Sequence, residues 1–297
     1  ATLAGSAEYY TGSDDVAIDY VFNGTWADIH AAQDLYYSGF YGVGAWTHNE
    51  DEVKALAAIV NTEARIHGYS TQAPESLVTK AEPSVAGDIL GQMQDLNYER
   101  SFGIYNANAD RDYPEMALLG KKLTTIPGAS TWMFSTLTGI ISDNLSLSQS
   151  QIVLDKGGNT YEDVSGIDMI RNGTMASGEF IDVMHGSDDL HSRTQTEVFR
   201  QLVVKANGGS KVSLSDQGVQ ELVATVESQI RISIGNDFIL ENLETTDAGG
   251  GVVVIPGYEI EVGLVSDLPA NIRAQRQAPD IRFQAVLASA IHKVIVR

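Results

Sequence analysis

Short apolar runs alternate with helical patterns through the first half of this chain, and this alternation most constrains its fold. Turn residues bound four runs that predict buried strands, at residues 39–46, 65–71, 101–106 and 131–135. The segments before and between them have apolar residues at helical spacing, over residues 14–30, 53–64, 83–96 and 112–124. Strands separated by helices require crossover connections. We therefore predict an α/β fold with a mainly parallel sheet and flanking helices.

Residues 157–193 predict a junction between two kinds of structure. Up to Ile181, glycines divide the segment into short runs, including GEFIDV, that are typical of small strands joined by tight turns. From Ser187 the pattern changes to helix-starting residues followed by apolar residues at every fourth position. A long amphipathic helix over residues 188–206 is the expected result.

The remaining sequence predicts a mixture of helix and strand. A second long helix is expected to begin near Ser215, and strands are expected at 252–255 and 258–262. The final run from Ile281 fits both a helix and a strand, and its β-branched residues favour the strand. We predict two domains, an α/β domain at 14–145 and a carboxy-terminal α+β domain, with two long helices and short strands, at 146–297.

Composition excludes several classes of protein and site. The chain of 297 residues has no cysteine, so disulfides and thiolate metal sites are excluded. Its formal charge of −20 argues against a nucleic-acid partner, because a phosphate backbone requires a basic surface. No stretch of the sequence approaches the length of apolar residues that a membrane span requires. We therefore expect neither nucleic-acid binding nor membrane insertion.

The few basic residues are concentrated near the end of the sequence. Within residues 268–297, Asp280 is the single acid, whereas five residues are basic: Arg273, Arg276, Arg282, Lys293 and Arg297. Two explanations stay open, a chance excess in a short window and a basic end that meets an acidic surface of another copy.

One cluster of residues could perform chemistry. Side chains able to bind a divalent metal are concentrated at Asp182, His185, Asp188, Asp189 and His191. Their spacing does not form an H-E-x-x-H motif, and we expect the two histidines on different elements. The structural alternative is that Asp188 or Asp189 caps a helix and His185 lies in a turn. A metal- or nucleotide-dependent enzyme that uses this cluster is thus the second hypothesis for function.

Other catalytic motifs are missing from the sequence. It contains neither a G-x-G-x-x-G turn between strand and helix nor a G-x-x-x-x-G-K-[ST] loop. It also lacks G-x-S-x-G, and no serine stands beside a plausible base. These absences favour a structural or assembly role, for which no cofactor and no catalytic residue are expected.

Several weak motifs follow one another in a fixed order: NTY at 159–161, GEFIDV at 178–183, DDL at 188–190, KVSLSDQG at 211–218 and AIH at 290–292. In this order they resemble the motifs of the contractile bacteriophage tail sheath protein family. The chain departs from the family pattern at Ser213, where a proline is usual, and after Asp189, where a tryptophan is usual. The resemblance covers residues 110–297 well and 30–110 loosely. It implies that the amino-terminal part of such proteins lies outside this sequence.

The resemblance implies a mechanical, non-enzymatic function. Sheath subunits form hexameric rings that stack helically around a tail tube, and they contract on a signal from the baseplate to drive the tube through the host envelope. The expected partners are other copies of the chain, the tube protein and the baseplate. The expected location is the virion tail, after assembly in the host cytoplasm. A contractile injection system outside phage would use the same mechanics.

Four basic residues near the carboxy terminus are the candidate interface residues. We expect them to contact the tube or an adjacent subunit: Arg273, Arg276, Arg282 and Lys293. Strand sharing between neighbours is a second expectation, since the β-rich end of the chain supplies a strand for an exposed sheet edge.

Overall fold

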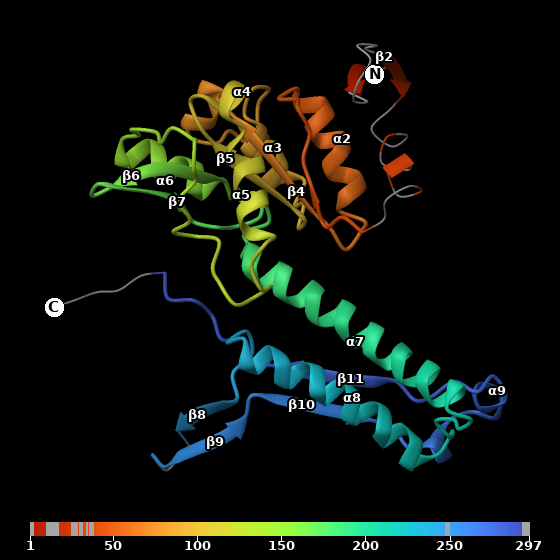
Figure 1. Ribbon diagram of the computed structural model, residues 1–297. Coiled ribbons are helices and arrows are strands. Elements are labelled where there is room, and N and C mark those ends of the chain that lie inside the picture. The colour runs from red at the N-terminus through yellow and green to blue at the C-terminus, as the bar shows by residue number, and fades with distance from the viewer. Residues whose placement is uncertain are drawn as a thin grey trace. The chain divides into compact units, whose positions relative to one another are not determined.

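The computed structural model describes residues 3–9, 18–24, 29, 32–33, 35, 39–246 and 250–292 (Figure 1). Its chain divides into two compact units. Unit 1 comprises residues 1–123 and 132–181, and unit 2 comprises residues 124–131 and 182–297. The division therefore lies further along the chain than the boundary predicted at 145/146. The reason is that the strands at 159–171 pair with the sheet of unit 1.

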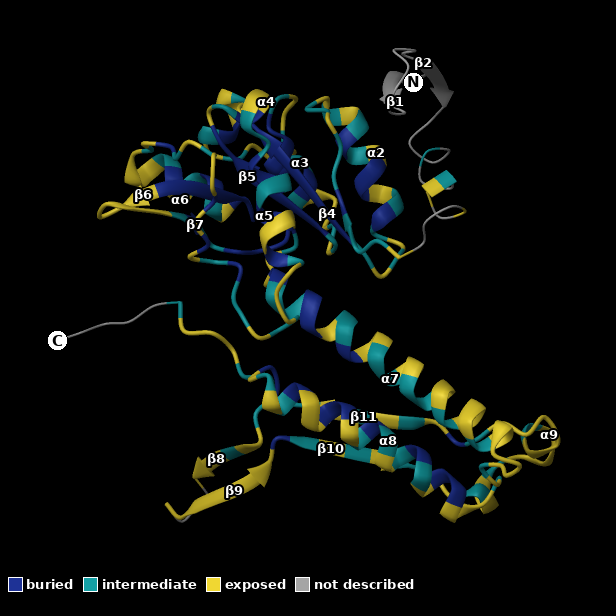
Figure 2. Cartoon of the chain, viewed as in Figure 1, coloured by how far each residue is buried: buried dark blue, intermediate teal, exposed yellow. Residues whose placement is uncertain are grey.

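The core of unit 1 is a five-stranded sheet in the order β3-β4-β5-β6-β7. Its strands are β3 (Gly42–Val43), β4 (Ile66–Thr71), β5 (Ser101–Tyr105), β6 (Asn159–Val164) and β7 (Ile167–Arg171). The first four strands run parallel, and β7 returns antiparallel beside β6. Every residue of β4 and β5 is buried, as expected for parallel strands covered on both faces (Figure 2). The predicted α/β fold with a mainly parallel sheet is confirmed.

Helices cover both faces of this sheet. The helices of unit 1 are α2 (Glu50–Val60), α3 (Ile89–Asp95), α4 (Ala109–Asp112), α5 (Pro114–Lys122) and α6 (Leu147–Asp155), with a 3-10 turn η1 at Pro74–Leu77. Tyr69 of β4 packs into one cluster with Leu90 of α3 and Val153 of α6. Its neighbour Gly68 faces the other way, where a Cβ atom would meet Leu119 of α5. Because adjacent strand residues point to opposite faces, α5 lies on the face opposite α3 and α6.

The described part of unit 2 is built from two long helices, two short helical elements and four short strands. The helices are α7 (Ile181–Asn207), α8 (Asp216–Gly235) and α9 (Ala270–Ala274), with a 3-10 turn η2 at Val265–Asp267. The strands form two antiparallel ribbons, β8 (Asn242–Thr246) with β9 (Val252–Pro256) and β10 (Tyr258–Val262) with β11 (Ile281–Ala285). The core joins Leu190 of α7 and Ile230 of α8 to Phe238, and one face of the β10–β11 ribbon packs against it.

A further antiparallel hairpin lies near the amino terminus. Its strands are β1 (Leu3–Tyr9) and β2 (Ile18–Gly24), and Leu3 pairs with Gly24. The helix predicted at 14–30 is therefore wrong over 18–24; the rest of that prediction falls mostly outside the described residues. The β-branched and aromatic residues of IDYVF explain the preference for strand.

Most helices and strands lie where the pattern placed them, but several ends moved. The strand predicted at 39–46 shrinks to β3, and the helix predicted at 83–96 begins only at Ile89. Helix α2 is capped by Asn49, whose side chain accepts hydrogen bonds from the backbone of Asp51 and Glu52. The carboxy-terminal strand is confirmed as β11, at 281–285.

The strand predicted at 131–135 does not form. Phe134 has a φ of 63°, a left-handed conformation that ends an extended run. The segment still meets the sheet edge, because Phe134 N donates to Ile170 O and Ile170 N donates to Ser135 O. Trp132 is buried and packs edge-on against Phe102 of β5. Tertiary contacts therefore hold this segment without a regular strand.

Helix α7 begins earlier than the sequence predicts. GEFIDV contains the first residues of the helix rather than a strand, and Ser187 lies inside it. Ile181 fixes the start: its side chain is fully buried, and its backbone N–H donates to Gly173 O. Gly186 is tolerated within the helix because Phe238 packs there; a Cβ atom at Gly186 would lie 2.5 Å from its ring.

Unit 1 contains a buried ion pair that ties α6 to the segment before α3. Lys156 Nζ lies 2.8 Å from Asp88 Oδ2, and both side chains are 2% exposed. The same ammonium donates to Glu75 O and Ser76 O, at 3.0 and 3.2 Å. Asp88 also caps α3 by accepting from Gly91 N. All three ammonium donors are thus satisfied, which a charge buried this deeply requires.

We predict that Lys156→Met lowers the free energy of unfolding by about 3–5 kcal/mol, because it leaves the Asp88 carboxylate buried without its cation. The matched control is Lys205→Met, which breaks a half-exposed pair with Glu221 and should cost less than about 1 kcal/mol. Chemical denaturation measures both losses. Equal losses in the two variants would contradict the assigned role of the buried pair.

A second prediction concerns His67 on β4. The side chain is 1% exposed and stacks on Tyr69, and burial lowers the pKa of His67 to about 3. Since this is below the pKa of an unfolded histidine, its contribution to stability is complete above about pH 6.5 and declines as the pH falls. We expect the free energy of unfolding to fall by about 2 kcal/mol from this group between about pH 7.5 and about pH 5.

His67→Gln should therefore flatten the pH dependence of unfolding over that range, and exposed His191→Gln is the control. Denaturation curves at several pH values provide the measurement. A slope that is the same in wild type and in His67→Gln would show that the histidine ionises in the folded state.

Candidate functional site

The predicted metal cluster lies entirely on helix α7. All five residues belong to this one helix, so the expectation that the two histidines occupy different elements is wrong: Asp182, His185, Asp188, Asp189 and His191. His185 is 7% exposed, and burial lowers the pKa of its imidazole, against the opposing charges of Asp189 and Asp188. Asp182 accepts from Val183 N in the first turn. The cap predicted at Asp188 or Asp189 is wrong, because the helix begins before them.

Asp189, one carboxylate of the cluster, takes part in the contact between the two long helices. Asp189 Oδ2 accepts from Arg193 Nε at 2.7 Å. The same guanidinium donates to Gln229 at 3.0 Å and Ser233 at 2.9 Å, both on α8. His191 is hydrogen-bonded to Gln195 one turn away. In the part of the chain that the structure describes, no group of three acidic, histidine or cysteine side chains could hold a metal ion. The cluster therefore has a structural explanation.

One serine does lie beside a base, contrary to the sequence-based expectation. Ser70 Oγ, on β4, is 3.2 Å from His48 Nε2. Burial lowers the pKa of His48. Burial also raises the pKa of Glu115, and a hydrogen bond from the Ser70 hydroxyl to this carboxylate opposes the rise. Ser70 is only 3% exposed, so its hydroxyl is enclosed rather than presented to a substrate.

The basic candidate residues lie at or near one end of unit 2. Arg273 belongs to α9, and Arg276 follows it with a φ of 58°. Arg282 is on β11 and lies 3.5 Å from Asp280. All three side chains are exposed. Lys293 falls outside the described residues.

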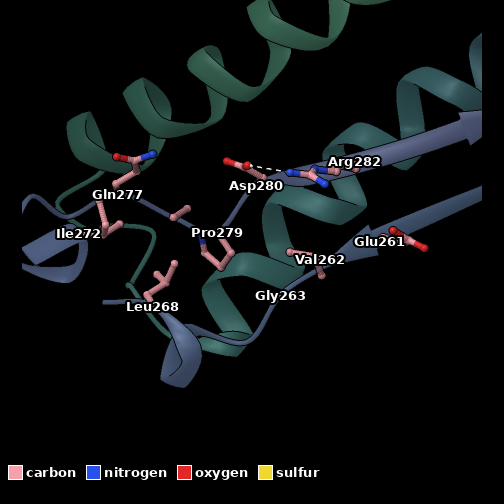
Figure 3. A pocket seen from close by; sticks show the side chains of 10 residues that line it. Glu261, Val262, Gly263, Leu268, Ile272, Gln277, Pro279, Asp280 and Arg282 are labelled. Atoms are coloured by element: carbon pink, nitrogen blue, oxygen red, sulfur yellow. Dashed lines mark hydrogen bonds and ion pairs between the residues drawn. The ribbon is translucent and has the colours of Figure 1, made fainter. Parts of the chain in front are cut away.

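Two hollows flank α9. The first, which we call the α9 pocket, has a volume of about 540 Å³ and lies between the α9 segment and the ends of β10 and β11. Figure 3 shows Leu268, Ile272 and Pro279 along its apolar side, with the Asp280–Arg282 pair at its rim. The second, the interhelix groove, has a volume of about 670 Å³. Its lining comes from α7, the α7–α8 loop, α8 and the segment after α9: Leu202, Lys211, Val212, Ser213, Leu214, Gly218, Val219, Leu222, Arg276 and Ala278.

The β8–β9 ribbon exposes four consecutive aliphatic residues. The exposed fractions are 70% for Val252, 39% for Val253, 57% for Val254 and 40% for Ile255. Because successive strand residues point to opposite faces, apolar side chains are uncovered on both faces. The sequence predicted a strand here but missed β8. The apolar run VVVI did carry a signal that this strand needs cover, because a strand without alternating polar residues is typical of one buried on both faces.

Helix α7 also presents apolar side chains to solvent near its end. Phe199 is 68% exposed, Leu202 is 43% exposed and Val204 is 60% exposed. Uncovered apolar area of this kind marks interaction surfaces on folded proteins. Among the described residues no helix is both long and apolar enough to cross a membrane.

Comparison with known proteins shows similarity of fold and none of sequence. No family model matches the chain, and no curated protein sequence matches it. The fold is similar to that of a chain in the cryo-EM structure of the anti-feeding prophage baseplate, with a TM-score of 0.60 and 10% identity. That alignment covers 94% of this chain and 74% of the other.

A second solved structure is the crystal structure of a sheath tail protein from Listeria innocua. It aligns with 93% of this chain at 8% identity and a TM-score of 0.47, and this chain spans 62% of its length. At these identities, what the comparisons establish is a fold shared with the baseplate chain.

Proposed function

We propose that this chain is a structural subunit of a contractile tail sheath, which polymerises around a tail tube and contracts to drive it through a host envelope. The observation that carries the proposal is the fold similarity to a chain of the anti-feeding prophage baseplate over 94% of the sequence. The order of sheath-like motifs between residues 159 and 292 agrees with it. On this proposal the protein is located in the virion tail, after assembly in the host cytoplasm.

The surface of unit 2 supports a role in self-assembly. The exposed β8–β9 ribbon and the uncovered end of α7 are apolar, whereas the chain as a whole has a formal charge of −20. Contacts between different surfaces of identical subunits generate rings when the rotation closes and helical filaments when it does not. Hexameric rings stacked into a helix use both kinds of contact. The partners on this proposal are other copies, the tube protein and the baseplate.

The two-stranded β10–β11 ribbon supplies sheet edges for strand sharing. Only its inner face packs against α7 and α8, and each of its strands has one neighbour within the described chain. An unpaired edge can accept an extended segment from another subunit through backbone hydrogen bonds. Contraction then requires two arrangements of these contacts that differ by a few kcal/mol per subunit.

A second candidate function is a ring subunit at the baseplate of a phage tail or of a contractile injection system outside phage. The observation that favours it is the baseplate origin of the chain with a TM-score of 0.60. A ring subunit would form a single closed layer on its tube, whereas a sheath subunit would form stacked layers. Negative-stain microscopy of the full-length protein with its tube protein separates the two.

The basic residues near α9 test the sheath proposal. We predict that Arg273→Glu, Arg276→Glu and Arg282→Glu, combined in one variant, shorten or abolish the sheaths that form around the tube. The reason is that a basic end facing an acidic neighbour becomes repulsive after charge reversal. The interface role of Lys293 is tested by adding Lys293→Glu to this variant.

The control reverses two exposed arginines elsewhere, each paired with a neighbouring acid: Arg111 and Arg231. Exposed pairs contribute little to stability, so this variant should assemble normally. Sheath length measured by negative-stain microscopy is the readout. Sheaths of normal length from the first variant would rule out an interface at these arginines.

A further inference from the structure

The β8–β9 ribbon has no covering partner in the part of the chain that the structure describes. The β10–β11 ribbon alternates half-buried and exposed residues, because one face packs on α8. In contrast, every residue of β9 is exposed, and four of five are exposed in β8. Figure 2 shows this difference along the two ribbons. An isolated two-stranded ribbon is marginal in water, and packing against a further surface stabilises it.

The ribbon projects in a direction fixed by its base. Gly257 N donates to Glu241 O at 2.9 Å, and Gly257 O accepts from Val286 N at 2.7 Å. Leu240 N in turn donates to Val286 O. A Cβ atom at Gly257 would lie 1.7 Å from Leu240 O, so only glycine permits this close approach. The base of the ribbon is therefore anchored to Val286, the residue that follows β11, and the ribbon is held in place as a projection.

The interhelix groove has the complementary chemistry. Val219 and Leu222 of α8 are buried on one side of it, and half-buried Leu214 comes from the loop. The two charged residues in its lining are Lys211 and Arg276, and none of the described residues that line it is acidic. In a chain with 39 acidic and 19 basic residues, an apolar groove with purely basic charge is suited to an apolar, acidic occupant.

The basic side chains at the groove are not neutralised within the described chain, where neither Lys211 nor Arg276 has an ion-pair partner. Both side chains are exposed. The ribbon supplies the opposite charge, because Glu241 and Glu244 are exposed beside its aliphatic residues. Apolar surface and charge therefore match on the two structures.

The β8–β9 ribbon lies at one end of unit 2, and the α7–α8 loop and α9, beside which the groove is lined, lie at the other (Figure 1). Since the base of the ribbon is anchored to Val286, it cannot fold back to its own groove. Binding of the ribbon in this groove would therefore join two copies through two different surfaces of the same chain. Such a head-to-tail contact repeats without being self-limiting, so it can build rings or helices.

We propose that the β8–β9 ribbon of one copy binds in the interhelix groove of a neighbouring copy, with Val252–Ile255 against the apolar walls and Glu244 facing Lys211 and Arg276. This inference rests on the proposed function, since it names one contact of the assembly. It adds a polarity to that assembly, because each copy offers a ribbon at one end and a groove at the other.

The test uses disulfide formation, because the native chain contains no cysteine. One full-length variant carries Val254→Cys on the ribbon, and a second, with an added tag to change its mass, carries Ser213→Cys in the groove. Mixing them under mild oxidation should give a mixed dimer on a non-reducing gel, since a disulfide requires Cα atoms within about 7 Å. A chain with both substitutions should give a ladder of covalent oligomers.

Ser148→Cys, at an exposed serine of α6, replaces Ser213→Cys in the matched control and should give no mixed dimer with Val254→Cys. Adding Arg276→Glu to the groove variant should lower the yield of mixed dimer about tenfold, and adding Glu244→Arg to the ribbon variant should restore it. Equal yields with Ser148→Cys and Ser213→Cys would overturn the proposal. So would dimers formed mainly between two Val254→Cys chains, which would show ribbons stacking on each other.

Microscopy of the same variants under reducing conditions separates this inference from the proposed function. Assembled rings or sheaths without the mixed disulfide would overturn the ribbon contact and leave the sheath proposal standing. Failure of the cysteine variants and of the wild-type chain to assemble would overturn both.

Discussion

Every apolar face of a sheet must be covered, and this constraint accounts for both the fold and the proposed assembly. In unit 1 the parallel strands β4 and β5 are buried along their whole length, and helices on both faces supply the cover. In unit 2 the helices α7 and α8 cover one face of β10–β11. The β8–β9 ribbon is left uncovered by the described chain. Apolar strand residues are thus buried within unit 1, whereas those of the β8–β9 ribbon in unit 2 form an exposed surface that another subunit could cover.

Polar contacts position the covering helices. Lys156 and Asp88 fix α6 beside the segment that leads into α3, with every ammonium donor used. Arg193 joins α7 to α8 through Asp189, Gln229 and Ser233. Both networks are specific because a buried polar group that loses its partner costs more than the contact contributes. The acidic residues that suggested a metal site are therefore better explained by helix packing.

The proposed mechanical function needs rigid units and contacts that can be exchanged. The buried cores of the two units supply the rigidity, whereas the exposed ribbon, the groove and the basic residues around α9 are at the surface. Contacts of this kind can be remade in a second arrangement without unfolding a subunit. The fold shared with the baseplate chain and these surface features are separate observations, and the proposed assembly rests on both.

The class of fold and the positions of most helices and strands follow from the amino-acid sequence alone. Periodicity identified β4, β5, α5 and α8, because their apolar spacing is local and strong. Periodicity left the final run ambiguous, and its β-branched residues correctly favoured a strand, β11. The sequence also excluded disulfides, since there is no cysteine.

The junctions between elements and the exposed surfaces depend instead on long-range packing. Helix α7 begins at Ile181 because that side chain is buried by residues distant in sequence, which overrides the strand preference of GEFIDV. The segment at 131–135 meets β7 without forming a strand because Phe134 takes a left-handed conformation. The interhelix groove combines Leu222 with Arg276, two residues that no local pattern relates. The local spacing of apolar residues predicts helices and strands, whereas long-range packing decides which apolar side chains stay exposed.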